Sequence, residues 1–284
     1  MKRLAVLAFL VLAGCGSLGA GQPHTLALAF KSGDTYKYKF HATSKQTAGM
    51  AGMSVPINVD TTAAETVTVK SVDSSGGADV TIALSGFTLK TSMGGVTNTT
   101  TGEPADSVEV TVHPDGTVAS VNGQALSGSS MLTAVTGLGG GFFIAAVLPD
   151  HAVKPGDTWS KTYDQSVPHG TGGVHVVTES TYVRDESTGG VNAAVVETKS
   201  TGSIDITEQN AGDPASGSIS VKGTFTTDVT TWIDSSGHRV VKSHSTAHDD
   251  VTIQLPSGSA AGSSPMLQGP VTAKGDSTTD LNPA

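Results

Sequence analysis

Residues 31–42 read KSGDTYKYKFHA, and their pattern indicates how the chain folds. Apolar residues stand at every second position from Tyr36 to Ala42, and Lys37, Lys39 and His41 alternate with them. Such alternation is typical of a β-strand with one buried and one solvated face. The Gly-Asp pair before it is a turn signal. The stretch therefore predicts a turn that leads into an antiparallel strand.

The same motif returns 123 residues later, where residues 154–159 read KPGDTW against KSGDTY at 31–36. Tyr36 and Trp159 hold equivalent places in the two copies. Two more pairs of turn sequences follow in the same order: residues 72–77 with 183–190, and residues 112–118 with 232–240. Three landmarks in register indicate an internal duplication.

The composition agrees with a β-rich chain. Its 284 residues include 38 Thr and 31 Val but 16 Leu, and branching at Cβ favours strands over helices. Only 14% of the residues are charged, which excludes a disordered polyelectrolyte and a coiled coil.

We therefore predict a mainly β, antiparallel fold in which two repeats form a large curved sheet or half-barrel. The predicted β-rich domain covers 24–284, with repeats at 24–128 and 149–284. The apolar residues between them, 129–148, are spaced as in a helix, and we expect this segment to fill the concave side of the sheet. A membrane-spanning role for it is disfavoured by its three consecutive glycines. Residues 271–281 are expected to form a last strand.

The N-terminus carries a targeting signal. Lys2 and Arg3 precede ten uncharged residues, LAVLAFLVLA at 4–13, which are too few to span a bilayer and fit a signal peptide. The run ends in Leu12-Ala13, and the sequence Leu12-Ala13-Gly14-Cys15 resembles the lipobox of bacterial lipoproteins. The resemblance implies cleavage after residue 14 and acylation of Cys15, for example by palmitate. Residues 15–23 would then be a lipid-anchored tether. The alternative is a plain secretory signal in which Cys15 is incidental.

Removal of residues 1–14 would leave 14 basic against 25 acidic residues, a net charge of −11. This balance argues against nucleic acid as a partner and against attachment to anionic lipid through basic residues. The membrane contact would be made by the lipid on Cys15. We expect an extracytoplasmic, membrane-anchored protein, in the periplasm at the outer membrane or on the outer face of the cell membrane. The Gly16 that follows the cysteine favours the outer membrane.

The Gly-Asp-aromatic repeat of residues 24–281 resembles an uncharacterised family of duplicated all-β envelope lipoproteins. The resemblance implies no activity. By architecture alone, a curved sheet filled by a helix is similar to the half-barrels of periplasmic lipoprotein carriers.

Sequence motifs for catalysis are missing: no Gly-x-Ser-x-Gly, His-Glu-x-x-His, Cys-x-x-Cys or Walker loop occurs in the chain. We expect that the protein is not an enzyme and that it has neither a cofactor nor a metal site. His244, His248 and Asp250 share one face of a predicted strand, but positions four apart on a strand lie about 13 Å from each other, too far to hold one ion.

Candidate ligand-cavity residues come from equivalent places in the two repeats and from the central segment: Tyr36, Trp159, Phe142, Phe143, Glu65 and Glu179. Glu65 lies on the apolar face of its predicted strand, where burial would raise the pKa of its carboxyl. A bulge or a salt bridge would make it merely structural, and the aromatic residues could simply fill the core.

The expected function is binding of an apolar or amphiphilic ligand in the concave sheet. The alternative is a structural or protein-interaction lipoprotein with a fully packed core, whose partner would be another envelope protein. The oligomeric state is left open.

Overall fold

The computed structural model describes residues 23–50, 53–102, 107–121, 124–125, 146–166, 170–209, 218–254 and 270–284. The fold is mainly β, and no helix occurs among these residues. No helix in this part of the chain is long and apolar enough to cross a membrane.

The first half of the chain contributes β1 (His24–Thr25), β2 (Thr35–Met50), β3 (Met53–Val72), β4 (Ala78–Met93), β5 (Val96–Gly102), β6 (Val108–Val112), β7 (Val118–Val121) and β8 (Gln124–Ala125). The second half contributes β9 (Ala152–Val153), β10 (Thr158–Ser166), β11 (Gly170–Thr188), β12 (Val191–Gln209), β13 (Ser218–Asp234), β14 (Val240–Gln254) and β15 (Pro270–Pro283).

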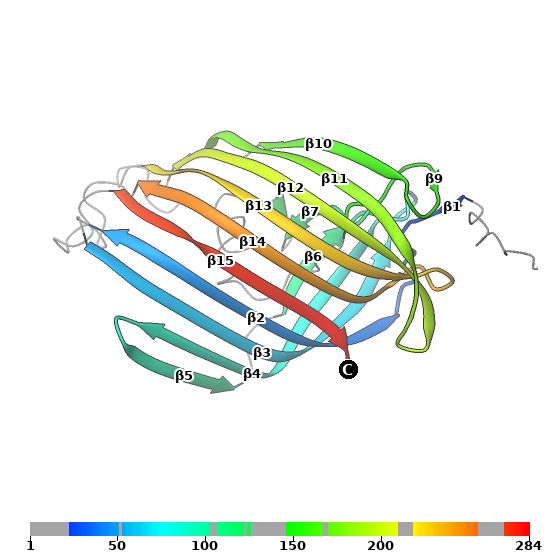
Figure 1. Cartoon of the computed structure of the whole chain (residues 1–284), viewed down its shortest axis with the longest axis horizontal. Coiled ribbons are helices and arrows are strands. Elements are labelled where there is room, and N and C mark those ends of the chain that lie inside the picture. The colour runs from blue at the N-terminus through cyan, green and yellow to red at the C-terminus, as the bar shows by residue number, and fades with distance from the viewer. Residues whose placement is uncertain are drawn as a thin grey trace, which may run out of the picture.

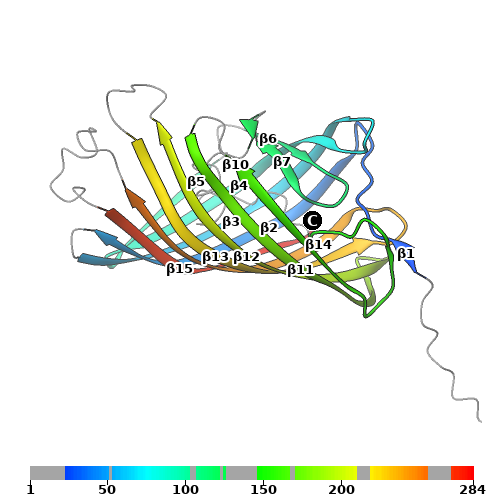
Figure 2. The same ribbon diagram turned by 90° about the horizontal axis from the view of Figure 1, so that it is seen from above.

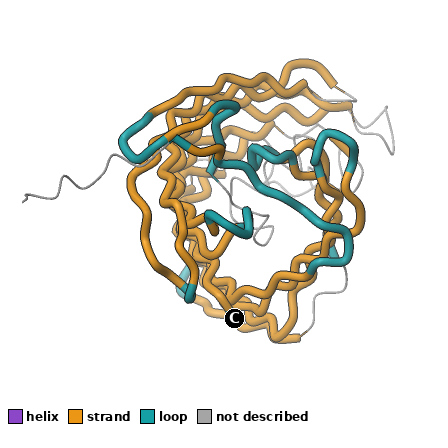
Figure 3. Tube along the Cα trace, turned by 90° about the vertical axis from the view of Figure 1, so that its right-hand side faces the viewer, coloured by secondary structure: helices purple, strands orange, loops and turns teal. Residues whose placement is uncertain are grey.

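One antiparallel sheet contains all of these strands except β1 and β9, which pair with each other. Its order is β10-β11-β12-β13-β14-β15-β2-β3-β4-β6-β7-β8, with β5 on the far part of β4. The last strand, β15, therefore pairs with β2 and joins the two halves of the chain (Figure 1). Figure 3, which looks along the long axis, shows the sheet rolled around that axis.

The two Gly-Asp turns are built with the same hydrogen bonds. In the first, Asp34 N donates to Lys31 O, Gly33 N donates to Val69 O, and Val69 N donates to Asp34 O. In the second, Asp157, Gly156, Lys154 and Tyr182 make the corresponding three bonds. Gly33 has a φ of 91° and Gly156 a φ of 96°, values that favour glycine at the third position of such a turn.

The predicted alternation of β2 is confirmed: Tyr38, Phe40 and Ala42 are buried, and Lys37, Lys39 and His41 are exposed. The buried side chains contribute to an apolar core in the half of the roll that carries β1 and β9, which we call the β1 end. The opposite end, where β2 meets β3 and β4 meets β5, we call the far end (Figure 2).

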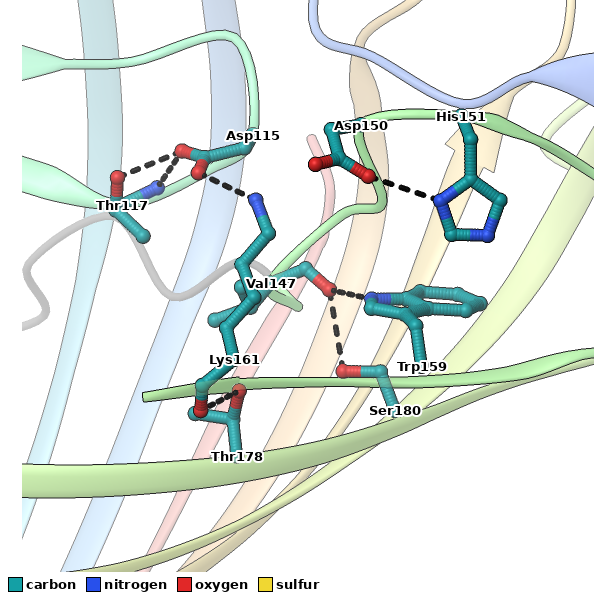
Figure 4. Close-up of polar contacts among 9 residues, drawn as sticks. All are labelled: Asp115, Thr117, Val147, Asp150, His151, Trp159, Lys161, Thr178 and Ser180. Atoms are coloured by element: carbon teal, nitrogen blue, oxygen red, sulfur yellow. Dashed lines mark hydrogen bonds and ion pairs between the residues drawn. The ribbon is translucent and has the colours of Figure 1, made fainter. Parts of the chain in front are cut away.

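Residues 146–148 form a strap that crosses the inside of the β1 end (Figure 4). Val147 O accepts hydrogen bonds from Trp159 Nε1 at 2.9 Å and from Ser180 Oγ at 3.1 Å. Leu148 N donates to Asp115 O at 2.8 Å. The strap thereby ties β10 and β11, at one edge of the sheet, to the turn between β6 and β7, near the other edge.

An ion pair reinforces this seam, since Lys161 Nζ of β10 lies 2.9 Å from Asp115 Oδ2 (Figure 4). Burial works to raise the pKa of Asp115, but hydrogen bonds from Thr117 and Lys161 outweigh it and lower the pKa. Asp115 therefore stays ionised and pairs with Lys161 between β10 and the β6–β7 turn.

The helical prediction for 129–148 is not supported by the part of it that the structure describes. Residues 129–145, including Phe142 and Phe143, lie outside the described residues, and Ala146, Val147 and Leu148 are not helical. Leu148 is instead buried in the core as part of the strap. The predicted last strand, 271–281, lies within β15.

Candidate functional site

The strand register determines which side chains face the inside of the roll. Directly paired residues of neighbouring strands point to the same side of a sheet. Ser180 and Trp159 both contact the strap, so their paired row defines the concave face. The alternate residues define the convex face.

The convex face is polar and internally paired. His244 Nδ1 lies 2.7 Å from Asp280 Oδ1, and His248 Nδ1 lies 2.8 Å from Asp276 Oδ1. Asp250 contacts the Lys274 ammonium at 3.0 Å. His244, His248 and Asp250 thus bind separate partners on β15, and no metal-binding group of three or more His, Cys, Asp or Glu residues occurs in the described ranges.

The concave face changes character along the roll. At the β1 end it is filled by the apolar core and the strap. Farther along, small hydroxyl and amide side chains are buried on it: Ser44, Gln46, Thr61, Thr178, Ser180, Thr198, Thr231, Ser243 and Ser245. A polar band therefore separates the core from the far half of the roll.

A second apolar cluster lies on the far half of the concave face, on β11 to β14. Its residues are Val174, Val176, Ile204, Ile206, Val221, Phe225 and Val251, with Ile253 at its side. We call this set the far patch. The far patch and the apolar core at the β1 end are two separate clusters of buried residues.

Large exposed apolar side chains occur on the concave face of β3, β4, β5, β10 and β13. Among the described residues, the large exposed apolar side chains are Met53, Val72, Met93, Val96, Tyr163 and Ile219. The register places all of these except Val72 on the concave face, toward the far end. Met93 is 53% exposed and Val96 is 64% exposed. The concave far half thus presents apolar surface, whereas the convex face presents charges.

Glu65 lies on the concave face, as its alternation with Val67 and Val69 predicts. It pairs with Tyr38 on β2 and Leu84 on β4. The residue is 0% exposed, and neither carboxyl oxygen has a hydrogen-bond partner. Desolvation by burial raises the pKa of Glu65 to about 8. A carboxyl in this place is largely protonated at neutral pH.

Glu179 does not accompany Glu65. It is exposed on the convex face and pairs with Ser160 and Lys199. The turn bonds explain the difference: Val69 corresponds to Tyr182, so the residue four places earlier, Glu65, corresponds to Thr178. Thr178 is buried on the concave face. Counting back from the glycine turns put the second glutamate one residue out of register.

The two aromatic candidates take different roles. Trp159 is 8% exposed, packs in the core and donates to the strap. Tyr36 is partly buried and lines a pocket of about 320 Å³ together with Tyr38, Arg239, Val241 and Pro283. The pocket lies where β15 ends at Pro283, beside the start of β14, and its walls are β2 and β14.

Asp249 was not among the residues predicted from the sequence. It stands on the concave face of β14, between Ala247 and Val251, and pairs with Phe225 and Gly275. It is 0% exposed, and neither carboxyl oxygen has a hydrogen-bond partner. Desolvation raises the pKa of Asp249 to about 6. The alternation that singled out Glu65 also applies here, because Ala247, Val251 and Ile253 mark the same apolar face.

The comparisons with known proteins give little further guidance. No protein-family model matches the chain, and no curated protein matches it. A structure described as lipid–protein interactions in lipovitellin aligns with 90% of this chain at 11% identity and a TM-score of 0.42. This chain covers 25% of that protein. A loop-deletion mutant of OmpT, an outer membrane protein of Vibrio cholerae, aligns over 88% of this chain and 100% of its own at 9% identity, with a TM-score of 0.15. Similarities of this size do not establish a shared fold.

Proposed function

We propose that this protein is a non-enzymatic, lipid-anchored protein of the bacterial envelope, which binds an amphiphilic ligand on the far half of its concave face. The observation that carries the proposal is the placement of the exposed apolar side chains. Met53, Met93, Val96, Tyr163 and Ile219 all face inward toward the far end. Exposed apolar side chains that share one face of a sheet are candidate contacts for an apolar group.

The polar band and the far patch suit the two parts of an amphiphile. An alkyl chain would lie against Tyr163 and Ile219, the exposed neighbours of the buried far patch, where burying apolar surface stabilises by about 25 cal/mol per Å². The polar group would meet the hydroxyl-lined band that begins with residues such as Ser245 and Gln46. The lipid on Cys15 would hold the domain close to a membrane, from which such a ligand can be taken.

The equal turns also support an ancestral duplication of the half-sheet. The Gly-Asp turns at residues 31–34 and 154–157 make equivalent hydrogen bonds 123 positions apart. In this proposal β2, β3 and β4 correspond to β10, β11 and β12. Each half alone would be an open curved sheet, and β15 joins the two.

Native mass spectrometry of the protein isolated from a bacterial envelope tests the ligand proposal. We expect a bound mass that solvent extraction identifies as a lipid or another amphiphile. The double variant Met93→Ser, Ile219→Ser should lower the bound fraction about tenfold or more, because each change removes about 1 kcal/mol of apolar contact. Lys90→Ser, Lys222→Ser changes the convex face of the same two strands and should leave the bound fraction unchanged. A ligand-free wild-type protein would contradict the proposal.

One observation favours a second candidate, a protein-interaction role. β5 (Val96–Gly102) is exposed along its whole length, carries no charge, and pairs only with β4 in the described part of the sheet. An uncharged exposed edge is a template for strand addition by a partner. Cross-linking from Thr99 in cells that returns one envelope protein, together with a ligand-free mass spectrum, would favour this role.

A further inference from the structure

We infer that Asp249 binds the positively charged amine of an alkyl-chain ligand on the concave face. This inference rests on the proposed function and names the chemical class of the ligand. It starts from the location of the carboxylate, which lies at the edge of the far patch beside Phe225 and Val251.

The row of residues that crosses the sheet at Asp249 places no charged group beside the carboxylate. In order across β12 to β2, the row is Gly202, Phe225, Asp249, Gly275 and Gln46. The ring of Phe225 lies over Gly202, where any Cβ would collide with it. The ring thus leans away from Asp249 on one side. On the other side the Gln46 side chain lies over Gly275, where a Cβ would collide with its Cγ. The carboxylate is flanked by an aromatic ring and an amide side chain, and its row supplies no counter-charge.

The positions above and below Asp249 along β14 are also small or apolar. Ala247 and Val251 precede and follow it on the concave face. Neither of these two side chains carries a hydrogen-bond donor, and neither carboxyl oxygen of Asp249 has a partner. A buried carboxylate without a donor is costly, because desolvation is not offset by a hydrogen bond or an ion pair.

The described strands offer no spare cation for this carboxylate. In the described strands, Lys161 is the one lysine or arginine that the register places on the concave face, and it is paired with Asp115. The charges next to Asp249 in sequence, His248 and Asp250, point to the convex face and bind Asp276 and Lys274 there. A bound ligand can supply the counter-charge that the described residues do not.

The chemistry selects an amine over other polar groups. A carboxylate accepts hydrogen bonds and donates none, so it repels an anionic head group and pairs best with an ammonium. Glu65 is a second buried, unpaired carboxyl on the concave face, but it lies in the core of the β1 end between Tyr38 and Leu84. The far patch, whose exposed neighbours Tyr163 and Ile219 would contact the alkyl chain, is adjacent to Asp249.

A competition among three probes with the same chain tests the inference. The full-length protein in a nonionic detergent is mixed with equal amounts of dodecylamine, dodecanol and dodecanoic acid near pH 8, and the bound species are counted by native mass spectrometry. We expect dodecylamine to dominate. Asp249→Asn should lower the amine-to-alcohol ratio about 10- to 100-fold, the range for loss of a charge-assisted hydrogen bond. Asp250→Asn, the neighbour on the convex face, should leave the ratio unchanged.

Each other outcome has a definite meaning. If all three probes bind and Asp249→Asn does not change the ratio, the inference is overturned and the proposed function stands. If no probe binds, the proposed function fails as well. If butylamine binds as tightly as dodecylamine, Asp249 is a simple cation site and the amphiphile is excluded. If Glu65→Gln loses the amine preference and Asp249→Asn keeps it, the amine binds at Glu65 and the inference is overturned.

Discussion

Replacing Glu65 with glutamine should change how the stability of the fold depends on pH. Burial raises the pKa of this carboxyl from its ordinary 4.5 to about 8. The folded state therefore holds its proton over a pH range in which the unfolded chain has released it. The free energy of unfolding falls with rising pH wherever the folded state binds more protons than the unfolded state. The wild-type protein should thus lose stability as the pH rises from 4.5 to 8.

The size of the effect follows from the shift in pKa. Each pH unit between the two pKa values corresponds to about 1.36 kcal/mol, so the whole interval of about 3.5 amounts to about 5 kcal/mol as an upper limit. Asp249, whose pKa is raised from 3.8 to about 6, contributes in the same direction at lower pH. The interval from pH 6 to pH 8 is therefore governed by Glu65, and there the loss should be about 2 to 3 kcal/mol.

Urea unfolding of the domain that begins at Gln22, measured at pH 5, 6, 7 and 8, gives the comparison. The wild-type free energy of unfolding should fall between pH 6 and pH 8, and that of Glu65→Gln should stay flat because glutamine does not titrate. Glu179→Gln is the matched control, since Glu179 is exposed on the convex face, and its curve should follow the wild type. If Glu65→Gln loses as much stability as the wild type over this interval, the reasoning about a dry, unpaired carboxyl at the β1 end is refuted.

The remaining predictions concern the strap, the turns and the anchor. Trp159→Phe removes one of the two donors to Val147 O and leaves the bond from Ser180, so it should lower the unfolding free energy by about 0.5 to 1.5 kcal/mol; an unchanged urea midpoint would argue against the strap. Gly33→Ala and Gly156→Ala should each cost about 1 to 2 kcal/mol, since both sites have φ above 90° and open space for a Cβ; clearly unequal losses would contradict equivalent turns. Cys15→Ser should move the protein from the membrane to the soluble fraction, and retention in the membrane would exclude the lipid anchor.

Local sequence patterns were sufficient to predict the strands and several of their faces. The alternation from Tyr36 to Ala42 depends only on the period of a strand, and the same reasoning placed Glu65 on the concave face. The Gly-Asp turns could be predicted because they require glycine with a positive φ. These features are set by residues close in sequence, so they can be found without knowledge of the tertiary fold.

Features that depend on distant pairing could not be predicted in this way. Nothing near β15 indicates that it pairs with β2, more than 200 residues away, because strand partners are selected by the whole sheet. Glu179 was placed by counting from a turn, and it stands ten residues before Gly189, whereas Glu65 stands eleven before Gly76. One residue of slip moves a side chain to the other face. Asp249 was missed because His248 and Asp250 on either side suggest a solvated strand.

Glu65 and Asp249 share burial and the lack of a partner, yet they affect the protein differently at neutral pH. With a pKa of about 8, Glu65 is mostly neutral at pH 7 and adds no net charge to the apolar core. With a pKa of about 6, Asp249 is mostly ionised at pH 7 and places a negative charge beside the far patch. A bound cation stabilises the folded state by an amount that grows with its concentration. An ammonium ligand should therefore raise the unfolding free energy through Asp249. The buried Glu65 lowers the unfolding free energy to the same extent with or without ligand.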